Sequence, residues 1–167
     1  MSKVLILTGP CGAGKTTISE LLEKEHGFIR INGDILDTEF FPQGGQWLEK
    51  NHVALIKSHD KILAKTKEAF DSGSNVVVDY IIFDKHLDFF EKFKKEFGNN
   101  LAIKVLFPDQ KHLNQRDINH QCWTSGPEHI SQSYGHFESL KMYLGEKNYI
   151  DTSEMTEDEV IKHLLQI

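Results

Sequence analysis

The sequence predicts an α/β fold, in which a parallel sheet is covered by helices on both faces. Two observations lead to this prediction. Short apolar segments alternate with stretches of helical periodicity along the 167 residues, a pattern typical of right-handed strand–helix–strand units. The first apolar segment also leads directly into a glycine-rich loop, residues 9–16, which opens a helical pattern. Because ligands of such sheets bind at the carboxyl ends of the strands, we expect the functional residues there.

The chain begins with a strand, a helix and a second strand. Residues 4–8 form an unbroken apolar run, as expected of a buried parallel strand. Residues 15–26 follow as a helix, which Gly27 can end, and residues 28–31 are a short second strand. Residues 37–46 mix aromatic residues with proline and glycines, which favours a loop or a short helix near a ligand over a regular element.

The middle of the chain contains the patterns of two amphipathic helices and two strands. A long helix is expected from about residue 47 to residue 70, with an apolar face formed by Val53, Ile56, Leu63 and Phe70. Residues 75–80 are the third strand. Asp84 can cap the next helix, whose buried stripe is formed by Leu87, Phe90, Phe93 and Phe97. Residues 101–107 are the fourth strand.

The last third of the chain is mainly helical. A helix opens at Asp109, and Pro127 is well placed to restart the helical pattern after an interruption. One helical face then carries Ile130, Tyr134, Phe137, Leu140 (or Lys141) and Leu144. Residues 148–151 are a short fifth strand. Thr156 and Glu159 form a capping box at the start of the final helix.

The loop after the first strand fits the pattern G-x-x-x-x-G-K-[ST] at every fixed position. Successive N–H groups of such a loop form a nest of phosphate size, and the positive end of the helix dipole lies at the same place. Lys15 is expected to reach the β- and γ-phosphates, and the Thr16 hydroxyl to bind Mg²⁺. The alternative is a glycine-rich turn that merely joins a strand to a helix. We favour nucleotide binding, by Gly9, Pro10, Cys11, Gly12, Ala13, Gly14, Lys15, Thr16 and Thr17.

Two aspartates follow strands at the same edge of the predicted sheet. Asp79 ends the third strand, where a carboxylate can accept hydrogen bonds from Thr16 and from Mg²⁺-bound water; the alternative is an aspartate that caps a turn. Asp34 follows the second strand and can accept a proton from a substrate hydroxyl or orient that hydroxyl. Its alternative role is the N-cap of a short helix, and the neighbouring Asp37 is the second candidate for the acceptor site.

Arginine is scarce, which draws attention to Arg116 as the only arginine of the second half. It lies on the helix after the fourth strand, where a guanidinium could close over the transferring phosphoryl group and stabilise its charge. The alternative is a surface ion pair with Asp109 or Asp117, which usually contributes little to stability.

Composition excludes several other classes of protein. The formal net charge is −6, whereas a domain that binds nucleic acid is normally basic. No apolar run approaches the length of a membrane span, and the first strand begins too early to leave room for a signal peptide. Cys11 and Cys122 are expected to be reduced thiols of a cytoplasmic protein. The histidines do not show the spacing of a zinc-binding helix.

With these motifs in hand, the sequence resembles the small P-loop kinases, the group of adenylate, shikimate and gluconate kinases and their antibiotic-phosphorylating relatives. The resemblance covers the whole chain in element order. It implies a P-loop NTPase three-layer sandwich with the strand order 2-3-1-4-5, in a single domain over residues 1–167, with a helical lid at about residues 109–126. Such lids commonly carry two arginines; here the second place falls to His120 or to Lys111. The stretch of residues 151–153 resembles the segment that packs near the adenine.

The resulting expectation is an ATP-dependent phosphotransferase that moves the γ-phosphate of ATP–Mg²⁺ to a hydroxyl of a small molecule, such as a sugar, a nucleoside or an antibiotic. Lys15, Asp34 and Arg116 are the catalytic candidates, and Thr16 and Asp79 are the metal-binding candidates. The alternative is a module that binds and hydrolyses ATP as a switch and has no small-molecule acceptor. Neither nucleic acid nor a membrane is an expected partner.

Overall fold

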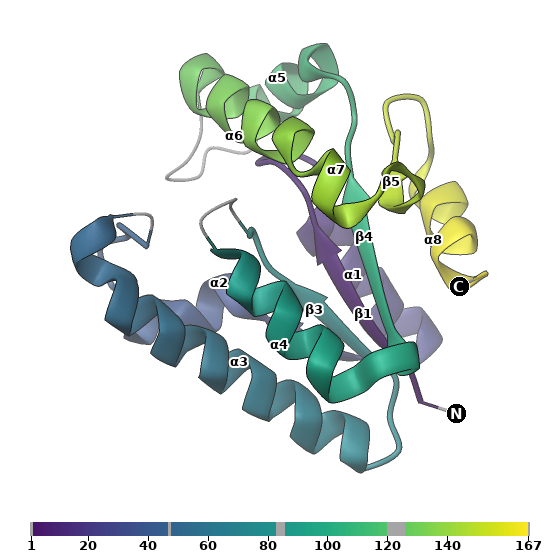
Figure 1. The fold of residues 1–167 in the computed structure, drawn as a ribbon. Coiled ribbons are helices and arrows are strands. Elements are labelled where there is room, and N and C mark those ends of the chain that lie inside the picture. The colour runs from purple at the N-terminus through teal and green to yellow at the C-terminus, as the bar shows by residue number, and fades with distance from the viewer. Residues whose placement is uncertain (1, 47, 83–85, 120–125, 167) are drawn as a thin grey trace.

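The computed structural model describes residues 2–46, 48–82, 86–119 and 126–166. Its centre is a sheet of five strands, all parallel, in the order β2-β3-β1-β4-β5 (Figure 1). Both the α/β class and the strand order predicted from the sequence are therefore confirmed. The strands are β1 (Val4–Thr8), β2 (Ile29–Asn32), β3 (Val76–Asp79), β4 (Leu101–Leu106) and β5 (Tyr149–Ile150).

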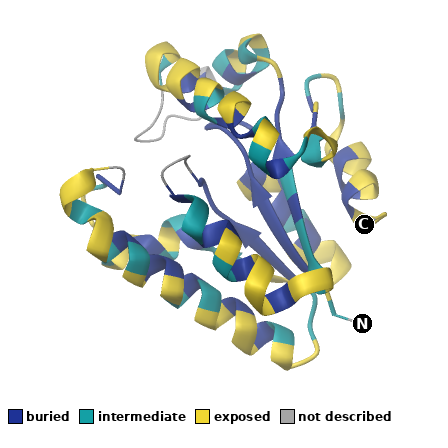
Figure 2. Ribbon diagram, in the orientation of Figure 1, coloured by how far each residue is buried: buried dark blue, intermediate teal, exposed yellow. Residues whose placement is uncertain are grey.

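Helices cover both faces of this sheet, since alternate residues of each buried strand point to opposite sides. Ile6 and Val78 pack on the face covered by α3, α4 and α7, whereas Leu7 and Val77 pack on the face covered by α1 and α8. The outer surfaces of these helices are exposed (Figure 2). The helices are α1 (Lys15–His26), α2 (Gly33–Leu36), α3 (His52–Asp71), α4 (Leu87–Phe97), α5 (Gln110–Asn119), α6 (Pro127–Ser139), α7 (Lys141–Leu144) and α8 (Glu157–Leu165), with short 3-10 turns η1 (Asp37–Glu39), η2 (Glu49–Asn51), η4 (Gly98–Asn100) and η5 (Glu146–Asn148).

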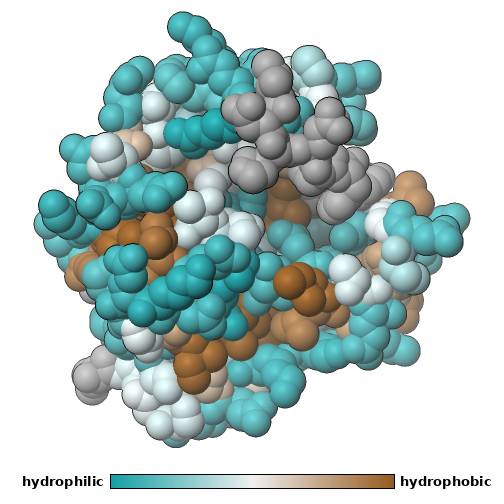
Figure 3. Space-filling view, turned by 180° about the vertical axis from the view of Figure 1, so that it is seen from behind, coloured by the Kyte–Doolittle hydropathy of each residue, from teal (hydrophilic) through white to brown (hydrophobic). Residues whose placement is uncertain are grey.

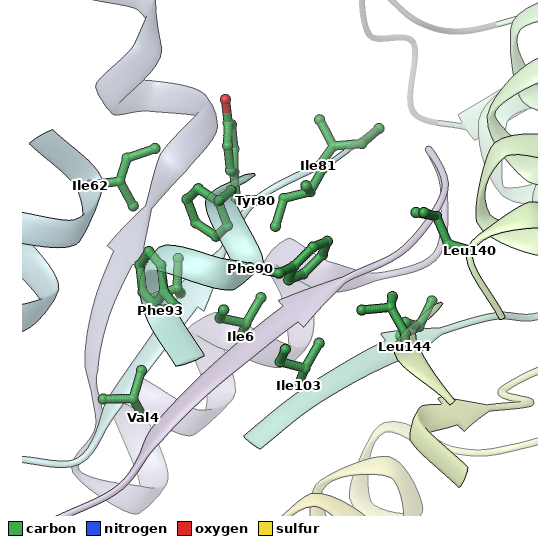
Figure 4. Packing of buried hydrophobic residues seen from close by; sticks show 14 of the residues in the cluster. Val4, Ile6, Ile62, Tyr80, Ile81, Phe90, Phe93, Ile103, Leu140 and Leu144 are labelled. Carbon is green, nitrogen blue, oxygen red and sulfur yellow. The ribbon is translucent and has the colours of Figure 1, made fainter. Parts of the chain in front are cut away.

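The aromatic stripe of α4 packs as the sequence predicts. Phe90 and Phe93 lie against β1 and β4 residues such as Ile6 and Ile103, and together they fill the space between α4 and the sheet (Figure 4). Burial of such large side chains is a principal source of stability, at about 1.5–3 kcal/mol each. The proposed cap of this helix, Asp84, lies outside the described residues.

The expected apolar face of the long helix is wrong in part. Val53 is 68% exposed, and α3 begins at His52 after a 3-10 turn rather than near residue 47. The buried stripe instead follows Leu55, Ile62 and Ala69, spaced by seven residues. Leu63 and Phe70 pack at its edge. The seven-residue spacing holds, but it fits two neighbouring faces of the helix, and the contacts of α3 with β2, β3 and α4 decide between them.

The sheet brings the predicted functional segments together at its carboxyl edge. Leu7 of β1 and Asn32 of β2 both lie beside Asp79 of β3 in the strand register. The phosphate loop after β1, the helix α2 after β2 and Asp79 therefore meet at one place.

Viewed from behind, the surface is mainly hydrophilic, and apolar residues form separate patches on it (Figure 3). Among the described residues, no helix combines the length and the apolar character needed to cross a bilayer.

Gly33 is where we expect a single methyl group to destabilise the protein. A Cβ at this position would lie 2.5 Å from Cγ of Tyr80, inside the contact distance of real side chains. We expect Gly33→Ala to lower the free energy of unfolding by about 1–3 kcal/mol, the usual cost of overpacking, as measured by urea denaturation. The matched control is Gly135→Ala on α6, where nothing lies within 4 Å and where alanine should stabilise the helix by about 0.5–1 kcal/mol. Equal stability of the two variants would contradict the close approach of Tyr80.

Candidate active site

The phosphate loop is clamped between β4 and α6. Gly9 has a φ of 148°, and a Cβ there would lie 2.3 Å from the carbonyl oxygen of Leu106, so only glycine fits. The backbone N–H of Cys11 donates to Oγ of Ser133 on α6 at 3.4 Å. The loop is thus held in place by neighbours on two sides before any ligand binds.

The first turn of α1 has the properties of an anion site. Its N-cap is Gly14, no side chain caps the turn, and the turn contains no acidic residue. The positive end of the helix dipole is therefore uncompensated. The ammonium group of Lys15 lies over the same loop and donates to the carbonyl oxygens of Gly9 and Pro10, both at 3.0 Å. The side chains of Thr16 and Thr17 are exposed beside it.

Asp79 is buried at the end of β3, and one of its carboxylate oxygens accepts two hydrogen bonds. Its Oδ2 accepts hydrogen bonds from Oγ of Ser19 at 2.9 Å and from the guanidinium of Arg30 at 3.0 Å. The sequence led us to expect Thr16 as the hydroxyl partner, and Ser19, one turn later on α1, takes this position. The other oxygen, Oδ1, is buried and has no hydrogen-bond partner in the described part of the chain.

Arg30 reaches Asp79 from β2 and is itself largely buried, with 13% of its side chain exposed. It also forms an ion pair with Glu20 of α1 at 3.2 Å. The structure turns this guanidinium inward, where it supplies the charge that balances Asp79.

Removal of this charge is expected to destabilise the fold. In Arg30→Met the carboxylate of Asp79, which is 1% exposed, loses its counter-charge, and breaking a buried pair in this way costs about 3 kcal/mol. The double variant Arg30→Met/Asp79→Asn should lose less, because no uncompensated charge remains. Urea unfolding of the wild type, both single variants and the double variant measures the difference. If the double variant lost as much as Arg30→Met alone, the pairing would contribute nothing.

Asp34 lies in α2, and the structure separates it from its alternative role. The N-cap of α2 is Asn32, whose side chain accepts from the N–H of Ile35 at 2.9 Å. Asp34 is thereby left to face the site, where its Oδ1 accepts from the N–H of Ile81 at 3.5 Å.

The surroundings of Asp34 favour its protonated form. Burial raises the pKa of its carboxyl from 3.8 to about 7. The Lys15 ammonium lowers this pKa, whereas the carboxylates of Asp79 and Asp37 raise it further. A carboxyl with this pKa exchanges a proton near neutral pH, as a general base requires.

Asp37, the second candidate for the acceptor site, is buried behind Asp34. Burial raises the pKa of its carboxyl to about 6, against two stabilising hydrogen bonds. These come from Nε2 of Gln46 at 3.1 Å and from the hydroxyl of Tyr80 at 3.2 Å.

Arg116 is half-buried on α5, and its guanidinium donates to the carbonyl oxygen of Thr152 at 3.1 Å. Within the described residues it makes neither of the ion pairs that formed its alternative role. Asp109 pairs with His112 at 2.8 Å, and Asp117 accepts from the N–H of Gly126 at 2.7 Å. Of the two candidates for a second lid cation, Lys111 is exposed and His120 lies outside the described residues.

One cavity of about 740 Å³ joins the predicted residues. The phosphate loop, Asp34 and Arg116 all line it, which places them around a shared space. Sequence reasoning missed the apolar and helix-terminal residues that complete its wall, because they carry no motif; they are Ile81, Leu106, Met155, Thr156, Glu157 and Val160. The residues described contain no group of three or more histidine, cysteine or acidic side chains arranged to hold a metal ion.

Comparison with known proteins agrees with this architecture. Residues 5–116, more than half of the chain, match the AAA domain family. A deoxyguanosine kinase from Bacillus subtilis (strain 168) is 30% identical over 93 residues, which are 53% of this chain and 44% of that protein. The chain thus matches less than half the length of this curated relative.

Solved structures of low sequence identity share the fold. A shikimate kinase from Acinetobacter baumannii aligns over 99% of this chain and 92% of its own, with a TM-score of 0.69 and 17% identity. A sugar kinase from Janibacter sp. HTCC2649 aligns over 99% and 94%, with a TM-score of 0.74 and 12% identity. The chain therefore belongs to the AAA domain family, and its fold is that of the small P-loop kinases.

Proposed function

We propose that this protein is an ATP-dependent phosphotransferase that acts on a hydroxyl group of a small molecule. The observation that carries the proposal is the shared cavity, in which an uncapped phosphate loop faces a carboxyl with a pKa of about 7. The kinases named among the relatives and structural neighbours support the same class of reaction.

The phosphate loop and Lys15 would bind the β- and γ-phosphates. In the free protein the Lys15 ammonium rests on two carbonyl oxygens of the loop, and it can exchange these for phosphate oxygens, which are better partners because they are charged. The remaining loop residues named above, from Gly9 to Thr17, would contribute backbone N–H groups and hydroxyls, except Pro10, which has no N–H. Met155 and Val160 would form an apolar wall for the nucleobase at the other end of the cavity.

We propose that a magnesium ion would be held by Thr16 and Asp79. The buried Oδ1 of Asp79 has no hydrogen-bond partner among the described residues, and Mg²⁺ prefers oxygen ligands, often with water between metal and carboxylate. When bound, the ion would neutralise charge on the phosphate oxygens. The Thr16 hydroxyl is exposed at the adjacent turn and is the second group proposed to hold it.

Asp34 would take the proton of the acceptor hydroxyl as the new bond forms. The acceptor oxygen bonds to the γ-phosphorus, the bond from that phosphorus to the bridging oxygen breaks, and ADP leaves with the electron pair. Arg116, which lines the same cavity, would stabilise the negative charge on the phosphoryl oxygens. We propose residues 109–126 as the lid that carries it; residues 120–125 lie outside the described part.

Incubation of the protein with ATP–Mg²⁺ and a library of small hydroxyl compounds tests the proposal, with products identified by mass spectrometry. A phosphorylated compound formed together with ADP is the expected result. The Lys15→Ala variant, purified in the same way and assayed alongside, controls for contaminating kinases. If phosphate were released from ATP at the same rate with every compound, and no compound were phosphorylated, the ATP-hydrolysing switch would be favoured instead.

A further inference from the structure

A buried group of polar side chains lies next to Asp34 and has no role in the reaction described above. It consists of Asp37 of η1, Gln46, Ser58 and His59 of α3, and Tyr80 after β3, and we call it the polar array. Each member is at most 8% exposed. Side chains of this kind are costly to bury without hydrogen-bond partners, so the array calls for an explanation.

Hydrogen bonds join Asp37, Gln46 and Tyr80 within the array, but two oxygen acceptors remain without a donor. Oδ2 of Asp37 accepts from both Gln46 and Tyr80. In contrast, Oδ1 of Asp37 and Oε1 of Gln46 are buried and have no hydrogen-bond partner in the described residues. Two oxygen acceptors on side chains that are already bonded to each other therefore lack a donor. A molecule that brings N–H or O–H groups would satisfy both.

The array continues directly from the proposed base. Asp34 and Asp37 are one helical turn apart, and the carboxylate of Asp37 is close enough to raise the pKa of Asp34. Tyr80 precedes Ile81, whose N–H bonds to Asp34. Figure 4 shows the Tyr80 hydroxyl directed away from the apolar cluster around Phe90 and Phe93. The array therefore lies directly behind Asp34 and the Ile81 backbone, both of which line the cavity.

The charge of the array disfavours an anionic occupant. Asp37 is acidic, and burial lowers the pKa of His59 to about 4, so this imidazole is neutral at pH 7. Two cations near the array are already paired: Arg30 with Asp79 and Glu20, and the half-buried Lys61 with Glu39. No cation of the described residues acts on the pKa of Asp37, so a carboxylate or phosphate held beside Asp37 would meet a like charge that no lysine or arginine offsets there.

We propose that the acceptor is an uncharged compound that binds through hydrogen-bond donors to Asp37 and Gln46. This inference rests on the proposed function. The two oxygens are buried, and the segment of residues 41–46, to which Gln46 belongs, is tied to Asp37 by the hydrogen bond from the Phe41 N–H to the Asp37 carbonyl at 2.9 Å. The acceptor reaches them when this segment, which carries Gln46 itself, moves outward.

A library of matched compounds tests the charge of the acceptor. Each uncharged hydroxyl compound is paired with an anionic partner, such as glucose with gluconate and methyl shikimate with shikimate. We expect phosphorylated products from uncharged members only. Products from gluconate or shikimate would overturn this inference and leave the proposed function intact. If no compound in the library were phosphorylated, the proposed function would fail, and the inference with it.

Variants of the array test its contact with the acceptor that is found. We expect Gln46→Met and Asp37→Asn to raise the KM for this acceptor about tenfold, with the KM for ATP unchanged. Gln43→Ala is the matched control, because Gln43 is exposed in the same segment and should leave both values unchanged. If the acceptor KM of both array variants equalled that of the wild type, the array would not contact the acceptor. If the array had a purely structural role, the variants would change the melting temperature but would not raise the KM for the acceptor selectively over the KM for ATP.

Discussion

Lys15→Ala is expected to lower kcat/KM for ATP by about 10²–10³-fold or more, the usual effect of removing one preorganised donor to a reacting oxyanion. Among the described residues, Lys15 is the cation that lies over the phosphate loop, where it donates two hydrogen bonds to loop carbonyls. Isothermal titration calorimetry with ATP and Mg²⁺ measures the loss of binding, and ADP formation measures the loss of turnover.

The matched control for this variant is Lys24→Ala. Lys24 belongs to the same helix, α1, but lies at its other end, is 69% exposed and makes only an ion pair with Glu20. Such pairs contribute at most about 1 kcal/mol to stability. Melting curves without ATP show whether either variant is misfolded. If Lys15→Ala bound ATP as tightly as Lys24→Ala, the glycine-rich loop would not be a phosphate site.

The features that could be predicted from the sequence are those that depend on residues close together in the chain. The strand β1, the helix α1 and the loop between them follow from an apolar run, a glycine pattern and a helical period, all within residues 4–26. The capping box of Thr156 and Glu159 is confirmed for the same reason. Strand order was available only through the resemblance to a known family.

The features that could not be predicted depend on contacts between distant segments. Arg30 and Asp79 are 49 residues apart, and nothing in the local sequence of either indicates that they pair. Likewise, Gln46 was part of an expected loop, and its bond to Asp37 depends on how that loop folds back over α2. The role of Asn32 as the N-cap of α2 is local and could have been found, since asparagine is a favoured cap.

Asp34→Asn is expected to lower kcat by about 10²–10⁴-fold, the range supplied by a general base, and to leave ATP binding nearly intact. The amide keeps the shape of the carboxyl and its contact with the N–H of Ile81, but it cannot take a proton. In the wild type, kcat/KM for the acceptor should rise with pH as Asp34 ionises and level off above its pKa of about 7. This ascending limb should vanish from the residual activity of the variant.

The same substitution is expected to stabilise the protein. A variant that is inactive but more stable has lost its general base and not its folded structure. The pKa of Asp34 is about 7 in the folded protein, against the ordinary value of 3.8 that applies to the unfolded chain. Protonation of Asp34 therefore stabilises the folded state fully below pH 3.8, and this stabilisation is lost as the pH rises through about 7. At about 1.4 kcal/mol per pKa unit, the loss amounts to at most about 4 kcal/mol. Asp34→Asn should therefore melt above the wild type at pH 8 and close to it at pH 4. Asp71→Asn, an exposed site at the end of α3, should show neither effect.

Full transfer activity in Asp34→Asn would mean that another group takes the proton, and Asp37 would be the next to replace.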